Sequence, residues 1–222
     1  MLSSTFFHRQ LDILPPSRAV TPIVVIGAGG IGSWTALCLA KIGCSNIIVF
    51  DPDVVEEHNL PSQLYTPEYI GKKKVEALKY IIKDMIDTTI TERPEAWDGE
   101  TVAPIVVSAV DSMKTRVEIF DKLKTRYGVA LYIDGRMGAE ILRLSTLRPA
   151  DSEQAAWYEK TLYTDEESVD APCTARAIAY NTLVIGGIIS SLVKHFLVGE
   201  FVPREIIFSL SDYTLYVAKK KL

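Results

Sequence analysis

The stretch PIVVIGAGGIG at residues 22–32 carries the strongest structural signal in the sequence. Its β-branched run, residues 23–26, predicts a buried parallel strand, and the glycine-rich segment that follows predicts a tight turn. Residues 33–42 place apolar side chains at helical spacing and stop at Gly43, so we expect a helix there. A second strand at residues 46–50 completes a β-turn-α-β unit, which links parallel strands by a right-handed crossover.

The remainder of the chain continues this alternation. We expect strands at residues 105–110, 131–133 and 140–147, helices at 72–86, 114–126 and 179–197, and a closing hairpin from 205–208 and 214–218. Residues 150–170 are acidic and polar, and predict a loop with some helix. The predicted fold is therefore α/β and Rossmann-like, with a mostly parallel central sheet flanked by helices and a C-terminal antiparallel hairpin.

Length and composition indicate one globular domain of 222 residues, with 48% hydrophobic and 23% charged residues and a net charge of −4. We expect a single domain over residues 1–222. We divide it into an N-terminal arm (1–21), a half that begins with the glycine-rich turn unit (22–135) and a C-terminal half (136–222). The acidic balance disfavours a protein that coats nucleic acid.

Cysteine usage and hydropathy restrict the function further. The three cysteines form no Cys-x-x-Cys pair, so we predict no structural zinc. No signal peptide is visible at the N-terminus, and polar residues interrupt the longest apolar stretch, residues 183–197. We therefore expect a cytoplasmic protein that does not act on a membrane.

The glycine turn has the context of a dinucleotide-binding fingerprint, because it follows a strand and opens a helix. Gly27 permits the tight turn, Gly29 beside Gly30 lets a phosphate approach the backbone, and Gly32 lets helix and strand pack closely. The helix N-terminus offers N–H groups and partial positive charge to that phosphate. Asp51 ends the second strand, where a carboxylate accepts hydrogen bonds from ribose hydroxyls. These features predict an adenine nucleotide, the alternative being a glycine turn without a ligand.

Four further motifs lie in order along the first 120 or so residues. They are FHRQ at 7–10, DPDVVEEHNLPSQL at 51–64, GKKKVEA at 71–77 and SAVDSMKTR at 108–116. Together they resemble the ThiF/MoeB/HesA superfamily, which includes the ubiquitin-activating enzymes. The resemblance implies ATP-dependent adenylation of a carboxylate, usually the C-terminal glycine of a ubiquitin-like or sulfur-carrier protein. It also implies that residues 1–222 are a single adenylation domain, in which residues 22–135 are the nucleotide-binding half and residues 136–222 the substrate-binding and dimerisation half.

The resemblance also implies roles for particular residues. Asp111 would hold Mg²⁺, Lys74 and Arg9 would contact the triphosphate, and Asn59 and Gln63 would bind it through neutral hydrogen bonds. Asp53 belongs to the same nucleotide-binding motif. The family's arm arginine often crosses a dimer interface, so the resemblance implies a homodimer in which Arg9 acts on the partner's ATP. Arg116 keeps two candidate roles, which are substrate binding and pairing with an acid.

The chemistry fits this set of residues. A terminal carboxylate, with a pKa of about 3.5, is already ionised at neutral pH, so no general base is needed. The obstacle is the approach of two anions, which requires positive charge and in-line positioning. One departure matters, because Ser62 stands where the family usually has an arginine. A hydroxyl cannot replace a bidentate phosphate contact, although Lys72 or Lys73 is a candidate substitute.

Cys173 lies in the segment APCT at residues 171–174, which resembles the segment around the thioester-forming cysteine of eukaryotic ubiquitin-activating enzymes. Its thiolate would attack the acyl-adenylate and carry the substrate as a thioester. The alternative is a buried or incidental thiol.

Two other functions remain open at this point. An NAD(P)-binding oxidoreductase or sensor is supported only by the glycine turn and Asp51. A non-catalytic scaffold subunit of an adenylating heterodimer is suggested by Ser62.

Overall fold

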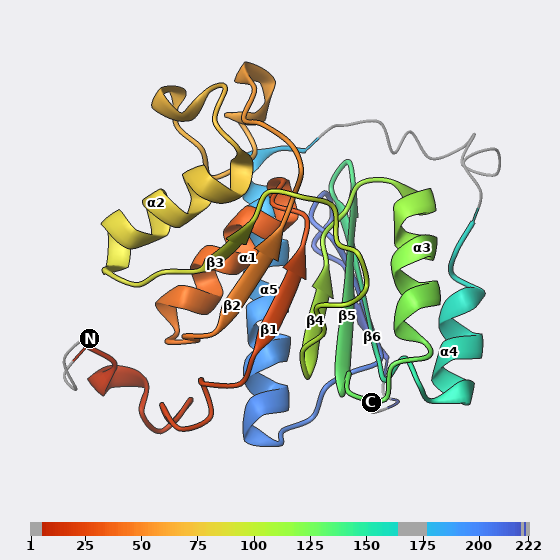
Figure 1. The fold of residues 1–222 in the computed structure, drawn as a ribbon. Coiled ribbons are helices and arrows are strands. Elements are labelled where there is room, and N and C mark those ends of the chain that lie inside the picture. The colour runs from red at the N-terminus through yellow and green to blue at the C-terminus, as the bar shows by residue number, and fades with distance from the viewer. Residues whose placement is uncertain (1–5, 164–176, 219, 221–222) are drawn as a thin grey trace.

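The computed structural model describes residues 6–163, 177–218 and 220, which form one eight-stranded sheet with helices on both faces (Figure 1). The strand order is β3-β2-β1-β4-β5-β6-β7-β8. The strands are β1 (Ile23–Ile26), β2 (Ile47–Phe50), β3 (Thr91–Arg93), β4 (Ile105–Ser108), β5 (Leu131–Gly138), β6 (Ile141–Leu147), β7 (Glu205–Ser209) and β8 (Leu215–Val217).

The helices connect these strands. They are α1 (Gly30–Lys41), α2 (Lys74–Ile86), α3 (Met113–Leu123), α4 (Ser152–Glu159) and α5 (Ala179–Val198), with short 3₁₀ turns at His8–Gln10, Glu57–Asn59 and Pro67–Tyr69. The strands from β3 to β5 are parallel to their neighbours, and the pairs from β5 to β8 are antiparallel. The predicted fold class is therefore confirmed, including the C-terminal hairpin.

The sheet order creates a switch point between β1 and β4. The chain leaves β1 toward β2 and β3 on one side, then returns to β4 on the other side of β1. Ligands of open α/β sheets bind at the carboxyl ends of the strands at such a point. The glycine turn follows β1 and Asp111 follows β4, so the fold brings both to this position.

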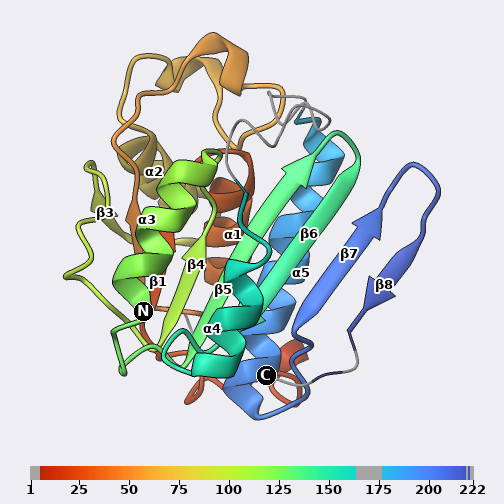
Figure 2. The same ribbon diagram turned by 90° about the vertical axis from the view of Figure 1, so that its right-hand side faces the viewer.

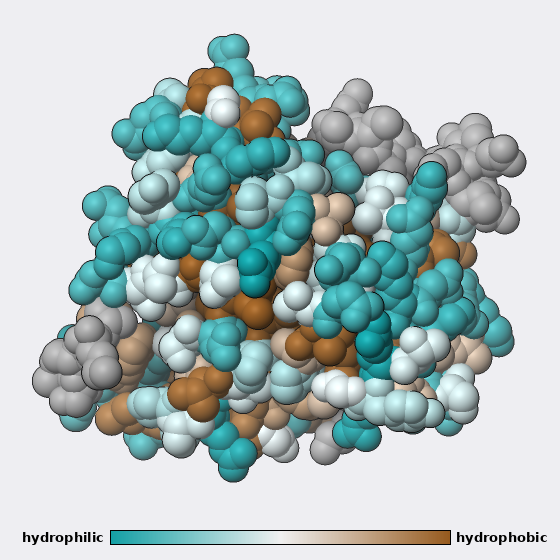
Figure 3. Space-filling model, viewed as in Figure 1, coloured by the Kyte–Doolittle hydropathy of each residue, from teal (hydrophilic) through white to brown (hydrophobic). Residues whose placement is uncertain are grey.

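Two hydrophobic layers hold the helices against the sheet. Alternate residues of β1 face opposite sides, with Val25 in the layer under α1, α2 and α5 and Val24 in the layer under α3 and α4. Figure 1 shows α3 and α4 together on one side of the sheet, and Figure 2 shows the β7–β8 hairpin at its free edge. Polar side chains cover most of the face in Figure 3, with a smaller hydrophobic area between the parts that carry β3 and α3.

Helices α1 and α5 lie parallel and very close together. A β carbon at Gly186 would lie only 3.0 Å from the β carbon of Trp34, so this glycine permits the close approach. By length and composition α5 is apolar enough to cross a membrane, contrary to the expectation that polar residues interrupt it too strongly, but half of it is buried in this fold. Its hydrophobicity is thus partly explained by packing against α1 and β5.

The sequence prediction missed one strand and misplaced some element ends. β3 has three polar residues at the sheet edge, where no buried face imposes an apolar pattern. α1 begins at Gly30 rather than residue 33, because the last part of the glycine motif already adopts helical geometry. β5 extends to Gly138 instead of ending at residue 133, because it continues into a long hairpin with β6.

Candidate functional site

The glycine turn is shaped by two glycines that no other residue fits. Gly27 has a φ of +98°, and a β carbon there would lie 2.7 Å from the carbonyl oxygen of Ala109. A β carbon at Gly32 would lie 1.8 Å from the carbonyl oxygen of Gly27. By contrast, the position of a β carbon on Gly29 is open, with Gln63 Nε2 the nearest atom at 3.9 Å. Gly27 and Gly32 therefore close the turn, and Gly29 leaves room in front of it.

Asp51 holds the turn from the end of β2. Its Oδ2 accepts a hydrogen bond from the Ala28 N–H at 2.6 Å, and its Oδ1 accepts one from the Asp53 N–H at 2.9 Å. Tyr65 completes the clamp by donating its hydroxyl to the Ala28 carbonyl at 2.6 Å. Burial, together with the charges of Asp51 and Asp53, raises the pKa of Tyr65, so its hydroxyl stays protonated. A ribose contact of Asp51 remains a prediction, since each carboxylate oxygen can accept a further bond.

The first turn of α1 is left open to an anion. Its N-cap is Gly29, which has no side chain to satisfy the N–H groups that begin the helix. The first turn of α5 lies alongside, because a β carbon at Gly30 would come within 2.9 Å of Thr182 Cγ2. Backbone N–H groups and the positive end of the α1 dipole therefore face the open space at Gly29.

Lys74 is a buried cation at the end of the sheet that carries the glycine turn. It begins α2, its side chain is 9% exposed, and its Nζ lies 2.8 Å from Asp53 Oδ2. The Lys74 N–H also donates to the Asp53 carbonyl at 3.0 Å. The segment 51–53 thus holds the glycine turn with one carboxylate and the lysine with the other.

The two lysines before Lys74 have different partners. Lys72 lies over the ring of Tyr69 at 4.9 Å, and Lys73 donates to the carbonyl of Pro52. Each lysine thus has a partner on its own loop, and a role for either in place of an arginine at position 62 stays a prediction. Ser62 itself is buried, and its carbonyl accepts a hydrogen bond from Trp34 Nε1 at 3.1 Å.

Asn59 and Gln63 follow on the same loop. Asn59 is buried, and its Oδ1 accepts a hydrogen bond from the Glu56 N–H at 2.9 Å, which fixes the orientation of its amide. Gln63 Oε1 is buried and has no hydrogen-bond partner among the described residues. A buried, unpaired amide oxygen on the side chain that borders Gly29 is expected where a ligand or water with a hydrogen-bond donor completes the site.

Asp111 is exposed three residues beyond the end of β4 and makes no hydrogen bond or ion pair with the described residues. It is therefore available to a cation at the switch point. Within the described part of the chain, no three His, Cys, Asp or Glu side chains are grouped as a protein metal site would require. Mg²⁺ does not need such a group, because it is usually held by one or two carboxylates together with substrate phosphates.

These residues fit a nucleoside triphosphate with its metal. The open position at Gly29 and the uncapped start of α1 suit phosphate oxygens, and the unpaired Gln63 Oε1 suits a donor of the nucleotide or of its hydration shell. Lys74 has a buried amine, and Asp111 has a free carboxylate of the kind that Mg²⁺ binds. All the predicted nucleotide-site residues lie in the loops or first helical turns that follow the parallel strands at one end of the sheet: Gly27, Gly29, Gly30, Gly32, Asp51, Asp53, Asn59, Gln63, Lys74 and Asp111.

Arg9, which is also predicted to contact the triphosphate, lies away from the glycine turn. Gln10 Nε2 donates to the Ile42 carbonyl at 2.6 Å, and Phe7 lies against Gly43, so the arm is docked at the C-terminal end of α1. The glycine turn is at the opposite end of this 12-residue helix, a separation of about 18 Å at 1.5 Å per residue. Arg9 therefore does not reach the turn of its own chain.

The structure describes two of the three cysteines. Cys173 lies outside the described residues, so its predicted role as a nucleophile is not placed in the fold. Burial raises the pKa of Cys44 to about 12 and also raises that of Cys38. Both of these thiols stay protonated at neutral pH, as expected for core residues.

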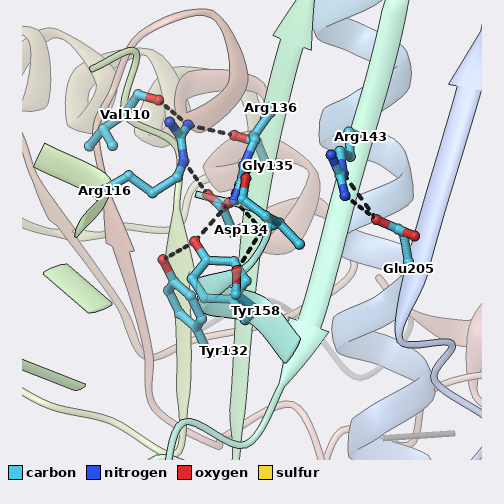
Figure 4. A network of polar contacts seen from close by, with 10 residues as sticks. Val110, Arg116, Tyr132, Asp134, Gly135, Arg136, Arg143, Tyr158 and Glu205 are labelled. Atoms are coloured by element: carbon cyan, nitrogen blue, oxygen red, sulfur yellow. Dashed lines mark hydrogen bonds and ion pairs between the residues drawn. The ribbon is translucent and has the colours of Figure 1, made fainter. Parts of the chain in front are cut away.

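A buried polar network adjoins the site on the side of β5 (Figure 4). Asp134, which is fully buried, accepts hydrogen bonds from Arg116 Nε and Arg136 Nε, both at 2.6 Å, and from the Tyr158 hydroxyl at 2.9 Å. Of the two roles considered for Arg116, the structure shows pairing with an acid. Sequence reasoning missed Arg136 and Tyr158, although Arg136 follows Asp134 at the spacing of two that places strand residues on one face.

The network also sets the charge of its members. Burial alone would raise the pKa of Asp134, but the two guanidinium groups outweigh burial and lower it. Two cations therefore face one anion, which leaves one positive charge uncompensated within this cluster. Further along the sheet, Arg143 of β6 pairs with Glu205 of β7 at 2.7 Å.

Comparisons with known proteins agree with this geometry. The profile of the ThiF family matches residues 19–217. Ubiquitin-like modifier-activating enzyme 5 of Culex quinquefasciatus is 34% identical over 116 residues, covering 44% of this chain and 29% of that protein. SAMP-activating enzyme E1 of Haloferax volcanii is 31% identical over 106 residues, covering 47% of this chain and 38% of that protein. The chain thus matches well under half of the length of these curated relatives.

A solved structure extends the likeness over the whole chain. The structure of E. coli MccB with ATP has a TM-score of 0.75 and covers 99% of this chain and 72% of that one. The sequence identity is 18%, so this match shows a shared fold.

We predict that Asp134→Asn lowers the free energy of unfolding by about 3–5 kcal/mol at pH 7, because it leaves two buried guanidinium groups without their carboxylate. A carboxyl with a lowered pKa in the folded state stabilises above its unfolded pKa, and this contribution disappears as pH falls through the folded value. The difference between wild type and variant should therefore shrink below about pH 4. Urea unfolding from pH 7 to pH 3 measures this difference in the free energy of unfolding. The control is Asp87→Asn, which removes the exposed carboxylate that pairs with Lys83 and should have a small effect. A difference that stays constant down to pH 3 would contradict the assignment.

Proposed function

The chain belongs to the ThiF family, and we propose that it catalyses the ATP-dependent adenylation of a carboxylate. The observation that carries the proposal is that the glycine turn, Lys74 and Asp111 all follow the carboxyl ends of the parallel strands of the sheet. A nicotinamide-dependent oxidoreductase would use the turn and Asp51, but it gives no role to Lys74, Gln63 or Asp111.

In the proposed reaction, a carboxylate oxygen of the substrate attacks the α-phosphorus of ATP. A new P–O bond forms, the bond from the α-phosphorus to the oxygen bridging to the β-phosphate breaks, and pyrophosphate leaves with the electron pair. Mg²⁺, when bound, neutralises charge on phosphate oxygens and so lowers the repulsion between the two anions.

The protein's own groups orient and polarise the reactants. N–H groups of the α1 start hold phosphate oxygens in the open position at Gly29. Lys74 adds a buried ammonium group, which Asp53 holds in place by a hydrogen bond. The unpaired Gln63 Oε1 accepts a hydrogen bond from the nucleotide or from its hydration shell.

We assign the carboxylate to the C-terminus of a small ubiquitin-like or sulfur-carrier protein. Two kinds of relative support this choice: one is named an activating enzyme for a ubiquitin-like modifier and the other an activating enzyme for SAMP. MccB has also been solved with MccA bound, which supports a peptide or small protein as the substrate class.

We further propose that the protein is a homodimer in which Arg9 reaches the partner's nucleotide. The position of the arm supports this, because Arg9 lies at the far end of α1 from the glycine turn of its own chain. A purely monomeric protein in analytical ultracentrifugation, with exchange activity intact, would contradict it.

We predict that Asp111→Ala abolishes the carboxylate-dependent exchange of labelled pyrophosphate into ATP, lowering its rate by about a hundredfold or more because the metal loses its protein ligand. A carrier protein ending in Gly-Gly serves as the carboxylate. Asp121→Ala removes an exposed carboxylate of α3 that pairs with Lys124, so this control should keep the wild-type rate. Full exchange by Asp111→Ala would refute the metal assignment. No exchange by the wild-type protein would favour a non-catalytic scaffold, in line with Ser62 at the arginine position.

We propose that Cys173 then attacks the acyl-adenylate, releasing AMP and forming a thioester. Incubation with ATP and the carrier protein should give a covalent adduct that dithiothreitol releases and that Cys173→Ala lacks. Cys38→Ala is the matched control, since the raised pKa of Cys38 makes it a poor nucleophile and the adduct should persist. An adduct that survives in Cys173→Ala would move the nucleophile to another residue.

A further inference from the structure

Arg116 joins two strand ends that the sheet itself leaves apart. The β4–β5 ladder ends with the pair Ser108 and Asp134. Beyond it, Arg116 Nη2 donates to the Val110 carbonyl at 2.6 Å and to the Gly135 carbonyl at 3.3 Å. One guanidinium thus replaces the missing ladder bonds and sets the separation of the two strands (Figure 4).

The direction of this guanidinium is fixed by Asp134. Arg116 Nε lies 2.6 Å from Asp134 Oδ1, and the side chains of Arg116 and Asp134 are 4% and 0% exposed. A planar guanidinium held at Nε has little freedom to reorient its Nη2 group. The Val110 carbonyl is therefore held in one position relative to β5.

Val110 directly precedes Asp111, the free carboxylate at the switch point. The position of the Val110 peptide determines where the Asp111 side chain starts, because the two residues share that planar peptide group. Replacing a whole buried ion pair with apolar residues of similar volume is often neutral or stabilising, although removing one partner alone is destabilising. Stability therefore gives only a weak reason for a charged cluster at this place.

We propose that Arg116 is a positioning residue that holds Asp111 where its carboxylate would bind Mg²⁺. The inference rests on the proposed function, and it deepens it by naming the residue that orients the metal ligand. Removing such a supporting contact typically weakens metal binding by about 10- to 100-fold.

Arg136 provides a matched control within the same network. It also donates to Asp134 at 2.6 Å and is largely buried, but its other hydrogen bonds go to the carbonyl and hydroxyl of Thr161 at 2.6 and 3.0 Å. Arg136→Lys therefore disturbs Asp134 as Arg116→Lys does, without removing a contact to the residue before Asp111.

The experiment measures ATP binding by calorimetry with Mg²⁺ and with EDTA, for wild type, Arg116→Lys and Arg136→Lys. The quantity compared is the factor by which Mg²⁺ tightens ATP binding, which cancels a general loss of affinity caused by altered stability. Thermal unfolding shows whether each variant is folded. We expect Arg116→Lys to lower the factor by about 10- to 100-fold and Arg136→Lys to leave it within about twofold.

An unchanged factor in Arg116→Lys, or an equal drop in both variants, overturns the inference and leaves the proposed function intact. If Arg116→Lys does not fold, Arg116→Gln is measured in its place. If neither folds, Arg116 is a stability residue and the inference is wrong. A wild-type protein that binds no ATP overturns the proposed function, and the inference with it.

Discussion

The carboxylate of Asp51 is the interaction on which the site depends. It is 7% exposed, and its two oxygens accept the N–H groups of Ala28 and Asp53. A buried carboxylate that lost these donors would carry a large desolvation cost, so both backbone segments are held to it. One side chain thereby fixes the glycine turn after β1 relative to the loop after β2, and Lys74 follows because Asp53 holds its amine.

The charged groups around the turn suit the proposed chemistry. Adenylation brings a carboxylate to a triphosphate, and both are anions. The buried amine of Lys74 lies on one side of the switch point, and a cluster of two arginines with one aspartate lies on the other. The Lys74 amine is held by Asp53 and the arginines by Asp134, so these groups are already oriented before a ligand binds.

Much of the fold was predictable because its signals are local. The run at residues 23–26 and the glycines after it specify the first strand and turn, and the structure has β1 at Ile23–Ile26. Thr91–Arg93 gave no signal, since three polar residues at a sheet edge have no buried face to repeat. The end of β5 was misjudged because Gly135 and Gly138 resemble a stop in the sequence but continue the strand in the hairpin.

The site was predictable to the extent that motifs carry it. The motifs identified Asp51, Lys74 and Gln63, but the clamp that Tyr65 adds depends on a contact 37 residues away in sequence. Likewise, the choice between substrate and acid for Arg116 required knowing that Asp134 of β5 lies beside α3. Such pairings arise from strand order and not from local sequence spacing.

The most direct measurement is a crystal structure of the protein with Mg²⁺ and a non-hydrolysable ATP analogue. We expect phosphates against the backbone of Gly29 and Gly30, the amine of Lys74 within hydrogen-bond distance of a phosphate oxygen, and the metal bound by Asp111. A triphosphate bound away from the glycine turn, with Lys74 and Asp111 directed elsewhere, would contradict adenylation at this site.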